Sequence, residues 1–196
     1  MKSRRAYYGM RAVGLIAVLL GGLLCGPVAA GTTDGPDWSE LARLTAVDGG
    51  SGDQFGWPVA VDGCTALVGA GYDDDAGPDS GSAYVFARSG IGWSQQAKLT
   101  ASDGAAGDLF GAGVDVSGGT AVVGAHGDDS GRGSVYVFVR TGTSWTLQTK
   151  LTASDGAAGD HLGESVAIDG DTLVAGALGD DAQRGAAYVF VRSGGA

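Results

Sequence analysis

The sequence contains few of the residues that enzymes and disulfide-rich domains depend on. Its 196 residues include two histidines and two cysteines, and one of the cysteines, Cys25, lies in the apolar N-terminal segment. If Cys25 is removed with that segment, Cys64 has no disulfide partner and a disulfide framework is excluded. The scarcity of histidine leaves little for general acid and base catalysis near neutral pH.

Basic residues are scarce as well. The chain has 12 lysines and arginines against 22 aspartates and glutamates, and its formal net charge is −10. Four of the basic residues, Lys2, Arg4, Arg5 and Arg11, lie among the first thirty. The rest of the chain is therefore more acidic still, and an acidic surface of this kind repels nucleic acid.

The sequence has a single long apolar run, at residues 13–24. About a dozen residues are too few to cross a bilayer, which takes roughly twenty. The run follows basic residues and is followed by small residues at Val28 and Ala30, the pattern of a cleavable signal peptide. We predict a signal peptide over residues 1–30, cleaved after Ala30, and a short linker over residues 31–37.

Export follows from this prediction, to the periplasm, the cell surface or the medium. Arg4-Arg5 loosely resembles a twin-arginine signal, and paired arginines also occur in ordinary basic leaders. Both export routes, general secretory and twin-arginine, therefore stay open.

An internal repeat is the main signal in the remaining chain. The motif Leu-Thr-Ala-x-Asp-Gly occurs at residues 44–49, 99–104 and 151–156, at offsets of 55 and 52 residues. The 38 glycines punctuate segments rich in valine and aromatic residues, which favours an all-β chain. Four antiparallel strands in each period of about fifty residues are typical of a β-propeller blade.

Each copy carries the same series of strand signals, with alternating apolar residues and glycine-containing turns. The first strands are expected at 59–61, 114–116 and 166–168, the second at 65–70, 120–125 and 172–177, the third at 81–88, 133–140 and 185–192, and the fourth at 93–99 and 145–151.

These signals predict a repeat region over residues 38–196. It comprises blades at approximately 47–101, 102–153 and 154–192 and an outer strand at 38–46 that could complete the last blade. Propellers have about four to eight blades, and three cannot readily enclose an axis. We therefore expect a partial propeller, or a homo-oligomer that completes the ring.

Two short elements recur in phase and identify a family. Phe-Gly precedes the first strand, and a Gly-Ala dipeptide ends the second; the copies are Phe55-Gly56 with Gly69-Ala70, Phe110-Gly111 with Gly124-Ala125, and the degenerate Leu162-Gly163 with Gly176-Ala177. The chain resembles FG-GAP repeats, the integrin-α-like β-propeller family, in a bacterial-type variant. The resemblance implies a propeller used for extracellular recognition or cell adhesion, and related blades accompany some secreted enzymes.

The family resemblance also implies calcium loops between the first two strands, but these connections are too short and too poor in carboxylates here to wrap the ion. Aspartates gather instead between the second and third strands. A calcium site there would use Asp73, Asp75, Asp79, Asp128, Asp129, Asp180 and Asp181. The interpretation we favour is that they cap turns and keep the surface soluble.

A second recurring set of aspartates flanks the repeat motif. Its members, which could bind ions but are more typical of braced turns, are Asp48, Asp53, Asp103, Asp108, Asp155 and Asp160.

One tryptophan falls outside the repeat. Trp57 has Ala112 and Glu164 at the matching positions, so we single it out as a ligand-binding candidate. Trp38, Trp93 and Trp145 recur in phase, which favours blade packing over binding. His126 and His161 form no recurring dyad, and we predict no catalytic residue.

The sequence thus predicts an exported, non-enzymatic module that binds an extracellular protein or glycan through propeller loops. The alternative is an accessory propeller region of a larger secreted enzyme. A free-standing hydrolase is the least favoured reading.

Overall fold

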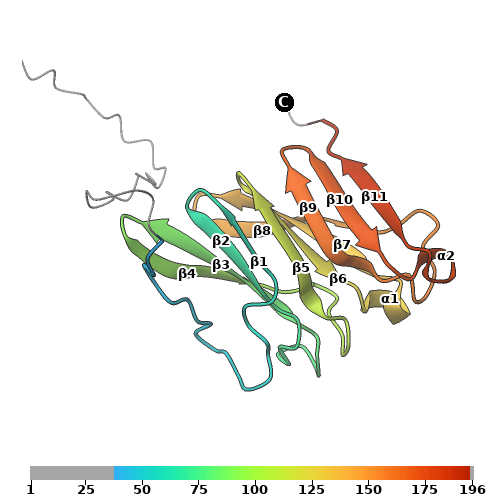
Figure 1. Cartoon of the computed structure of the whole chain (residues 1–196), viewed down its shortest axis with the longest axis horizontal. Helices are drawn as coiled ribbons and strands as arrows, with labels where there is room; N and C mark the ends of the chain where they lie inside the picture. Colours follow the sequence, from blue (N-terminus) through green and yellow to red (C-terminus); the bar gives the residue numbers. More distant parts are fainter. Residues whose placement is uncertain (1–37, 195–196) are drawn as a thin grey trace, which may run out of the picture.

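The computed structural model describes residues 38–194 and shows an all-β fold. Eleven strands form three antiparallel sheets, which lie side by side in Figure 1 with the first at the left and the last at the right. The predicted signal peptide at 1–30 and the linker at 31–37 lie outside the described residues. No helix within residues 38–194 is long and apolar enough to cross a membrane.

The first two sheets have four strands each, paired in chain order. The first sheet contains β1 (Val59–Asp62), β2 (Thr65–Ala70), β3 (Ser82–Ser89) and β4 (Gly92–Leu99). The second contains β5 (Phe110–Ser117), β6 (Thr120–Ala125), β7 (Ser134–Thr141) and β8 (Ser144–Leu151). A short helical turn, α1 (Asp128–Gly131), lies between β6 and β7.

The third sheet has three strands, β9 (Leu162–Asp169), β10 (Thr172–Ala177) and β11 (Ala186–Val191), with the turn α2 (Asp180–Gln183) before β11. No fourth strand pairs with β11 among the described residues. The chain is therefore a partial β-propeller of three blades, and its sheets do not close into a ring.

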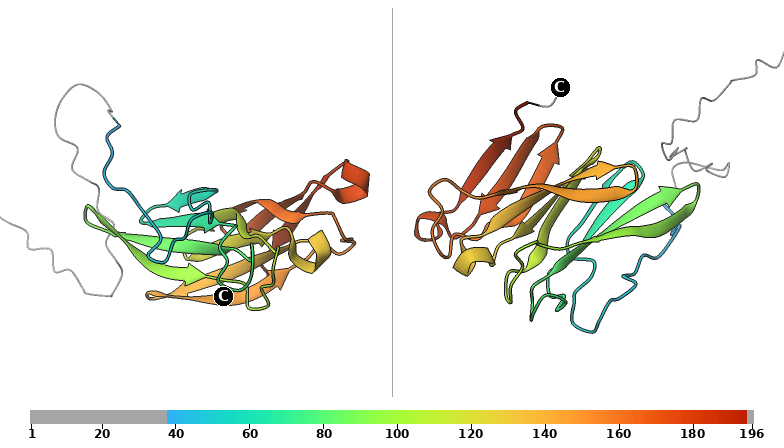
Figure 2. Two further views of the ribbon diagram at one scale, coloured as in Figure 1. Left: turned by 90° about the horizontal axis from the view of Figure 1, so that it is seen from below. Right: turned by 180° about the vertical axis from the view of Figure 1, so that it is seen from behind.

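The blades pack face to face through two clusters of buried side chains. The first junction joins Leu67 and Val85 of the first blade to Val114, Val123 and other residues of the second. The second junction repeats this arrangement one blade later, with Val122 and Val137 facing Leu173, Ala175 and other residues of the third blade. The alternation of apolar residues along each strand supplies one face to each junction. Figure 2 shows the stacked sheets from two further directions.

Glycines bring neighbouring blades into backbone contact. A side chain at Gly124 would overlap the carbonyl oxygen of Gly163, and one at Gly69 would overlap that of Gly111. These are the glycines of the two repeat motifs. One motif in each blade therefore docks against the other motif in the next blade, which gives the recurring glycines a packing role.

Residues 38–46, expected as an outer strand, form no strand in the structure. The matching segments of the first two blades, β4 and β8, pair with the third strand of their own blade, β3 and β7, whereas no third strand precedes this segment among the described residues. Its end nevertheless packs like theirs, since Leu44 and Ala46 cover the outer face of the first blade. Figure 1 shows this segment and β11 at opposite ends of the arc.

Cys64, in the turn between β1 and β2, is disulfide-bonded in the structure of the whole chain. The expectation that it has no disulfide partner concerns the chain without residues 1–30 and stays a prediction.

Candidate functional site

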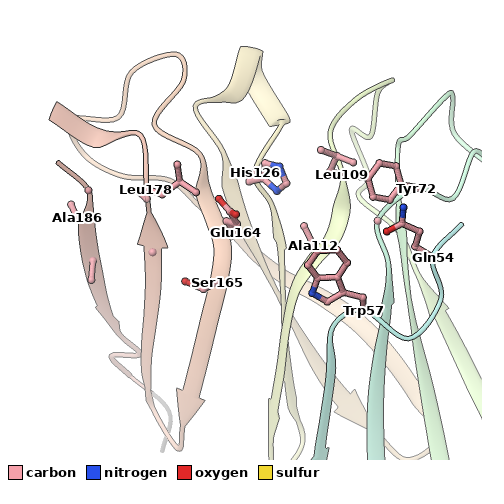
Figure 3. Close-up of a pocket in the computed structure, with 15 residues that line it drawn as sticks. Gln54, Trp57, Tyr72, Leu109, Ala112, His126, Glu164, Ser165, Leu178 and Ala186 are labelled. Carbon is pink, nitrogen blue, oxygen red and sulfur yellow. The ribbon is translucent and has the colours of Figure 1, made fainter. Parts of the chain in front are cut away.

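A groove of about 790 Å³ crosses all three blades near the ends of their first and second strands. Figure 3 shows Gln54, Trp57 and Tyr72 on the first blade and Glu164, Ser165 and other residues on the third. Ala112 and His126 of the second blade lie between them.

Trp57 is the most prominent aromatic side chain of the groove. It precedes β1 and is 73% exposed, and Tyr72, which follows β2, is 41% exposed. Ala112 and Glu164, the residues matching Trp57 in the other blades, also line the groove. The repeat therefore places one variable position of each blade at this surface, and Trp57, the ligand-binding candidate, is one of the three.

His126 brings a titratable group to the middle of the groove. Burial lowers the pKa of His126 and outweighs the opposing effect of the Glu164 carboxylate. The His126 ring packs edge-on against His161, with 5.6 Å between centroids, and its Nδ1 atom is buried without a hydrogen-bond partner. The Nδ1 atom of the neutral imidazole could therefore form a hydrogen bond with a ligand in the groove.

This combination offers both apolar and polar contacts to a ligand. An exposed indole and a phenol offer flat apolar faces, and Gln54, Glu164 and Ser165 offer hydrogen bonds nearby. Concave sites that recognise ligands commonly combine apolar walls with a few polar groups.

The aspartates of the first blade engage a lysine. The ammonium group of Lys98 contacts Asp48 at 2.9 Å, Asp73 at 3.0 Å and also Asp75. The Tyr84 hydroxyl donates to Asp73 at 2.8 Å. Burial opposes ionisation of Asp73, but the hydrogen bonds from Lys98 and Tyr84 outweigh it and lower its pKa.

The second blade repeats this network. The Lys150 ammonium lies 2.8 Å from Asp103 and 2.6 Å from the buried Asp128, which also accepts a hydrogen bond from Ser134. The Tyr136 hydroxyl donates to Asp103. Hydrogen bonding to Lys150 lowers the pKa of Asp103.

In the third blade the Tyr188 hydroxyl lies within hydrogen-bond distance of both Asp155, at 2.9 Å, and Asp180, at 2.5 Å. No basic side chain within residues 38–194 forms an ion pair with either carboxylate.

The other proposed calcium ligands occupy turns. Asp79, Asp129 and Asp181 have left-handed backbones, with φ of 55°, 52° and 49°, and no group of three or more metal-ligating side chains is gathered within residues 38–194. Calcium at these loops stays a prediction, whereas the protein's own lysines already neutralise Asp73 and Asp128.

The second recurring set of aspartates includes turn braces, as expected. Asp53, Asp108 and Asp160 each accept a hydrogen bond from the backbone N–H three residues earlier, at 2.6, 2.7 and 2.6 Å. The in-phase tryptophans also pack: Trp93 lies against the outer cluster of the first blade, and Trp145 packs in the first junction. Trp38, by contrast, is fully exposed.

Sequence reasoning missed two features of the site. The lysines of the networks precede the Leu-Thr-Ala motif in phase, so this signal was present in Lys98 and Lys150. The meeting of His126 with Glu164 had no such signal, because residues of different blades come together only through blade packing.

The fold defines a bladed repeat protein of the β-propeller class. Residues 38–86, 93–138 and 145–190 match the FG-GAP repeat family, and these three matches cover well over half of the chain. The chain therefore belongs to the FG-GAP repeat family, as its repeated motifs indicate. A comparison with curated proteins found no match to the chain.

Proposed function

We propose that this chain is an exported, non-enzymatic recognition module that binds an extracellular glycan in the groove across its three blades. The observation that carries the proposal is the exposed indole of Trp57, which stands at the wall of a groove of about 790 Å³. An aromatic face can stack on the apolar face of a sugar ring, and adjacent polar groups can hydrogen-bond its hydroxyls.

The polar lining supports a binding role. The groove is lined by polar side chains from all three blades, namely Gln54, His126, Glu164 and Ser165. At each of these positions, the other two blades carry a different residue type. These side chains are spread along the groove, so an extended ligand could contact several of them at once. Recognition or adhesion outside the cell agrees with the predicted signal peptide.

The test is saccharide binding to the purified full-length chain, followed by tryptophan fluorescence and calorimetry over a panel of oligosaccharides. We expect Trp57→Ala to weaken binding at least tenfold and Tyr72→Ala to weaken it less. The matched control is Ile91→Ala, which removes an exposed apolar side chain from the hairpin between β3 and β4, outside the groove. Failure to bind any saccharide, or equal affinity in wild type and both groove variants, would contradict the proposal, and peptide binding instead would indicate a protein ligand.

A second candidate, an accessory blade region of a larger secreted enzyme, is favoured by the exposed valines on the outer faces of the first and third blades, such as Val61 and Val189, which could receive another domain. It predicts a catalytic domain in the same reading frame of the parent gene.

A further inference from the structure

Within residues 38–194, some apolar positions on the outer faces of the first and last blades are exposed, although the matching positions are buried at the junctions inside the protein. Val189 on β11 is 63% exposed, while its in-phase counterpart Val137 is 6% exposed in the second junction. On the opposite end, Val59 is 65% exposed, and its counterpart Val114 is 7% exposed in the first junction. The third blade thus exposes the face that each earlier blade packs on the blade after it. The first blade exposes the face that each later blade packs on the blade before it.

The last blade keeps a backbone position for docking that no other blade fills among the described residues. In the first two blades, a side chain at Gly81 or Gly133 would overlap the backbone of Phe110 or Leu162, respectively, from the next blade. The matching glycine, Gly185, has the same left-handed backbone, with φ of 75°, but a side chain built there meets only its own blade at 3.6 Å or more. The position is shaped for the Phe-Gly motif of a following blade.

The acidic pair of the last blade has no basic partner within the part of the chain that the structure describes. Lys98 and Lys150 lie across the strand pairing from Tyr84 and Tyr136, respectively, and each bridges the two aspartates of its blade that match Asp155 and Asp180. Tyr188, the third tyrosine of this series, contacts Asp155 and Asp180 without such a lysine.

The residue that matches Lys98 and Lys150 at the other end of the chain is Arg43. It stands directly before Leu44-Thr45-Ala46, as each lysine stands before its own Leu-Thr-Ala, and it is the only basic residue of the segment 38–46. Leu44 and Ala46 pack on the outer face of the first blade, as their counterparts Leu99 and Ala101 pack on the second blade. The residues before Leu44 are therefore placed at the outer side of the first blade.

We propose that two copies of this chain associate head to tail and close a ring of six blades. In each of two identical contacts, the outer face of the third blade packs on the outer face of the first blade of the second copy. Residues 38–43 of the second copy add the missing fourth strand beside β11, and Arg43 of the second copy sits between Asp155 and Asp180. Phe55 of the second copy docks at Gly185.

The occupant is a second copy because both halves of the contact are already seen together inside one chain. The two internal junctions are head to tail, and a head-to-tail contact must either close into a ring or continue as a filament. Six blades fall within the usual range of about four to eight, which favours closure by two copies. Trp57 remains at the groove, because its counterparts Ala112 and Glu164 line the groove beside complete junctions.

The first test is the mass of the purified full-length chain by light scattering at micromolar concentrations. We expect twice the monomer mass; a monomer, or a ladder of ever larger species, would overturn the proposal. Val189→Asp and Val61→Asp each place a charge in the contact, at opposite ends of the chain, and each alone should yield monomers. Mixing them should restore a dimer held by the one contact that carries neither charge. If either variant dimerises alone, the contact is not head to tail.

The second test addresses the exchanged strand. Arg43→Glu should lower the dimer association constant at least tenfold, Arg43→Lys should preserve it, and the control Glu40→Gln, which installs the residue found at Gln95 of β4, should have no effect.

In β3–β4 and β7–β8, Arg88 pairs with Trp93 and Arg140 with Trp145. The same register places Trp38 of the second copy beside Arg192, so the double variant Trp38→Cys, Arg192→Cys should form intermolecular disulfides on oxidation. The control pair Trp38→Cys, Ile91→Cys should not, and equal cross-linking by both pairs would contradict the register.

Discussion

The ammonium group of Lys150, on the outer strand β8, lies 2.6 Å from the carboxylate of Asp128, in the loop that follows β6. The Asp128 side chain is almost fully buried, and Lys150 is its only basic partner within residues 38–194. The pair therefore ties the outer edge of the second blade to the loop that leads back to its third strand.

Replacing Lys150 with methionine should destabilise the protein. The change leaves the buried Asp128 without its cation, at a cost of about 1–3 kcal/mol, a range that allows for the partial exposure of Lys150. Urea unfolding measures this loss. The control is Asp171→Asn, which breaks an exposed pair with Arg192 and should cost no more than about 1 kcal/mol. Equal losses of unfolding free energy in the two variants would show that the buried pair stabilises the protein no more than the exposed pair does.

Gly124→Ala should be severely destabilising, because the new methyl group would overlap the carbonyl oxygen of Gly163 and force the second and third blades apart. We expect a loss of at least about 2 kcal/mol in urea unfolding. Gly119→Ala is the control: its methyl group would lie 3.7 Å from the nearest atom, so the change should stay within about 0.5 kcal/mol. A tolerated Gly124→Ala would mean that the blades do not approach this closely.

Stability should fall as the pH drops below about 6.5. Burial lowers the pKa of His126, so between the folded and unfolded pKa values the unfolded chain binds more protons. The contribution is therefore fully present above the unfolded pKa and is lost as the pH falls, by at most about 1.4 kcal/mol per pH unit. Urea midpoints at pH 7.5 and 5.5 measure it. His126→Leu, which installs the residue that follows β10 at Leu178, should remove most of this dependence, and an unchanged slope would assign it to another group.

Calcium should have little effect on stability. Lysines already neutralise Asp73 and Asp128, and a protein ammonium occupies the position that a metal ion would need. Thermal unfolding with calcium and with a chelator measures the effect, and the two midpoints should agree. A calcium-dependent rise of several degrees would establish the calcium interpretation of these loops, because a ligand that binds only the folded state stabilises it.

Expression of the full-length chain in a bacterial host should yield a mature protein that begins at Gly31. The expectation rests on the small residues Val28 and Ala30 before the predicted cleavage point. Intact mass spectrometry of the exported fraction measures it. Retention of residues 1–30 on the exported chain would contradict the predicted signal peptide.

Most of the fold could be predicted from the sequence because the repeat fixes the phase of every blade. The second strands, Thr65–Ala70, Thr120–Ala125 and Thr172–Ala177, were predicted with the bounds that the structure shows. The first strands of the second and third blades begin four residues earlier than predicted, at Phe110 and Leu162. Pairing with the preceding blade's loop extends them, as when the Phe110 amide donates to Ser80 at 3.0 Å, and no local pattern reports such a contact.

The candidate site was predictable only in part. Trp57 could be singled out because it breaks the repeat, and it does line the groove. The aspartates looked like metal ligands because the in-phase lysine of each network lies 22 to 25 residues away in sequence and reaches them only after strand pairing. The segment 38–46 has the sequence of a strand, but it pairs with no strand among the residues that the structure describes.

The glycine of the Phe-Gly motif and the residue that follows it have different roles. The glycines Gly111 and Gly163 hold neighbouring blades together through their backbone carbonyls, while the next residue, Ala112 or Glu164, faces the groove. Because blade cohesion depends on main-chain atoms, mutations at the groove position can accumulate without loosening the scaffold. The architecture thus leaves natural selection free to change what the groove recognises, one blade at a time.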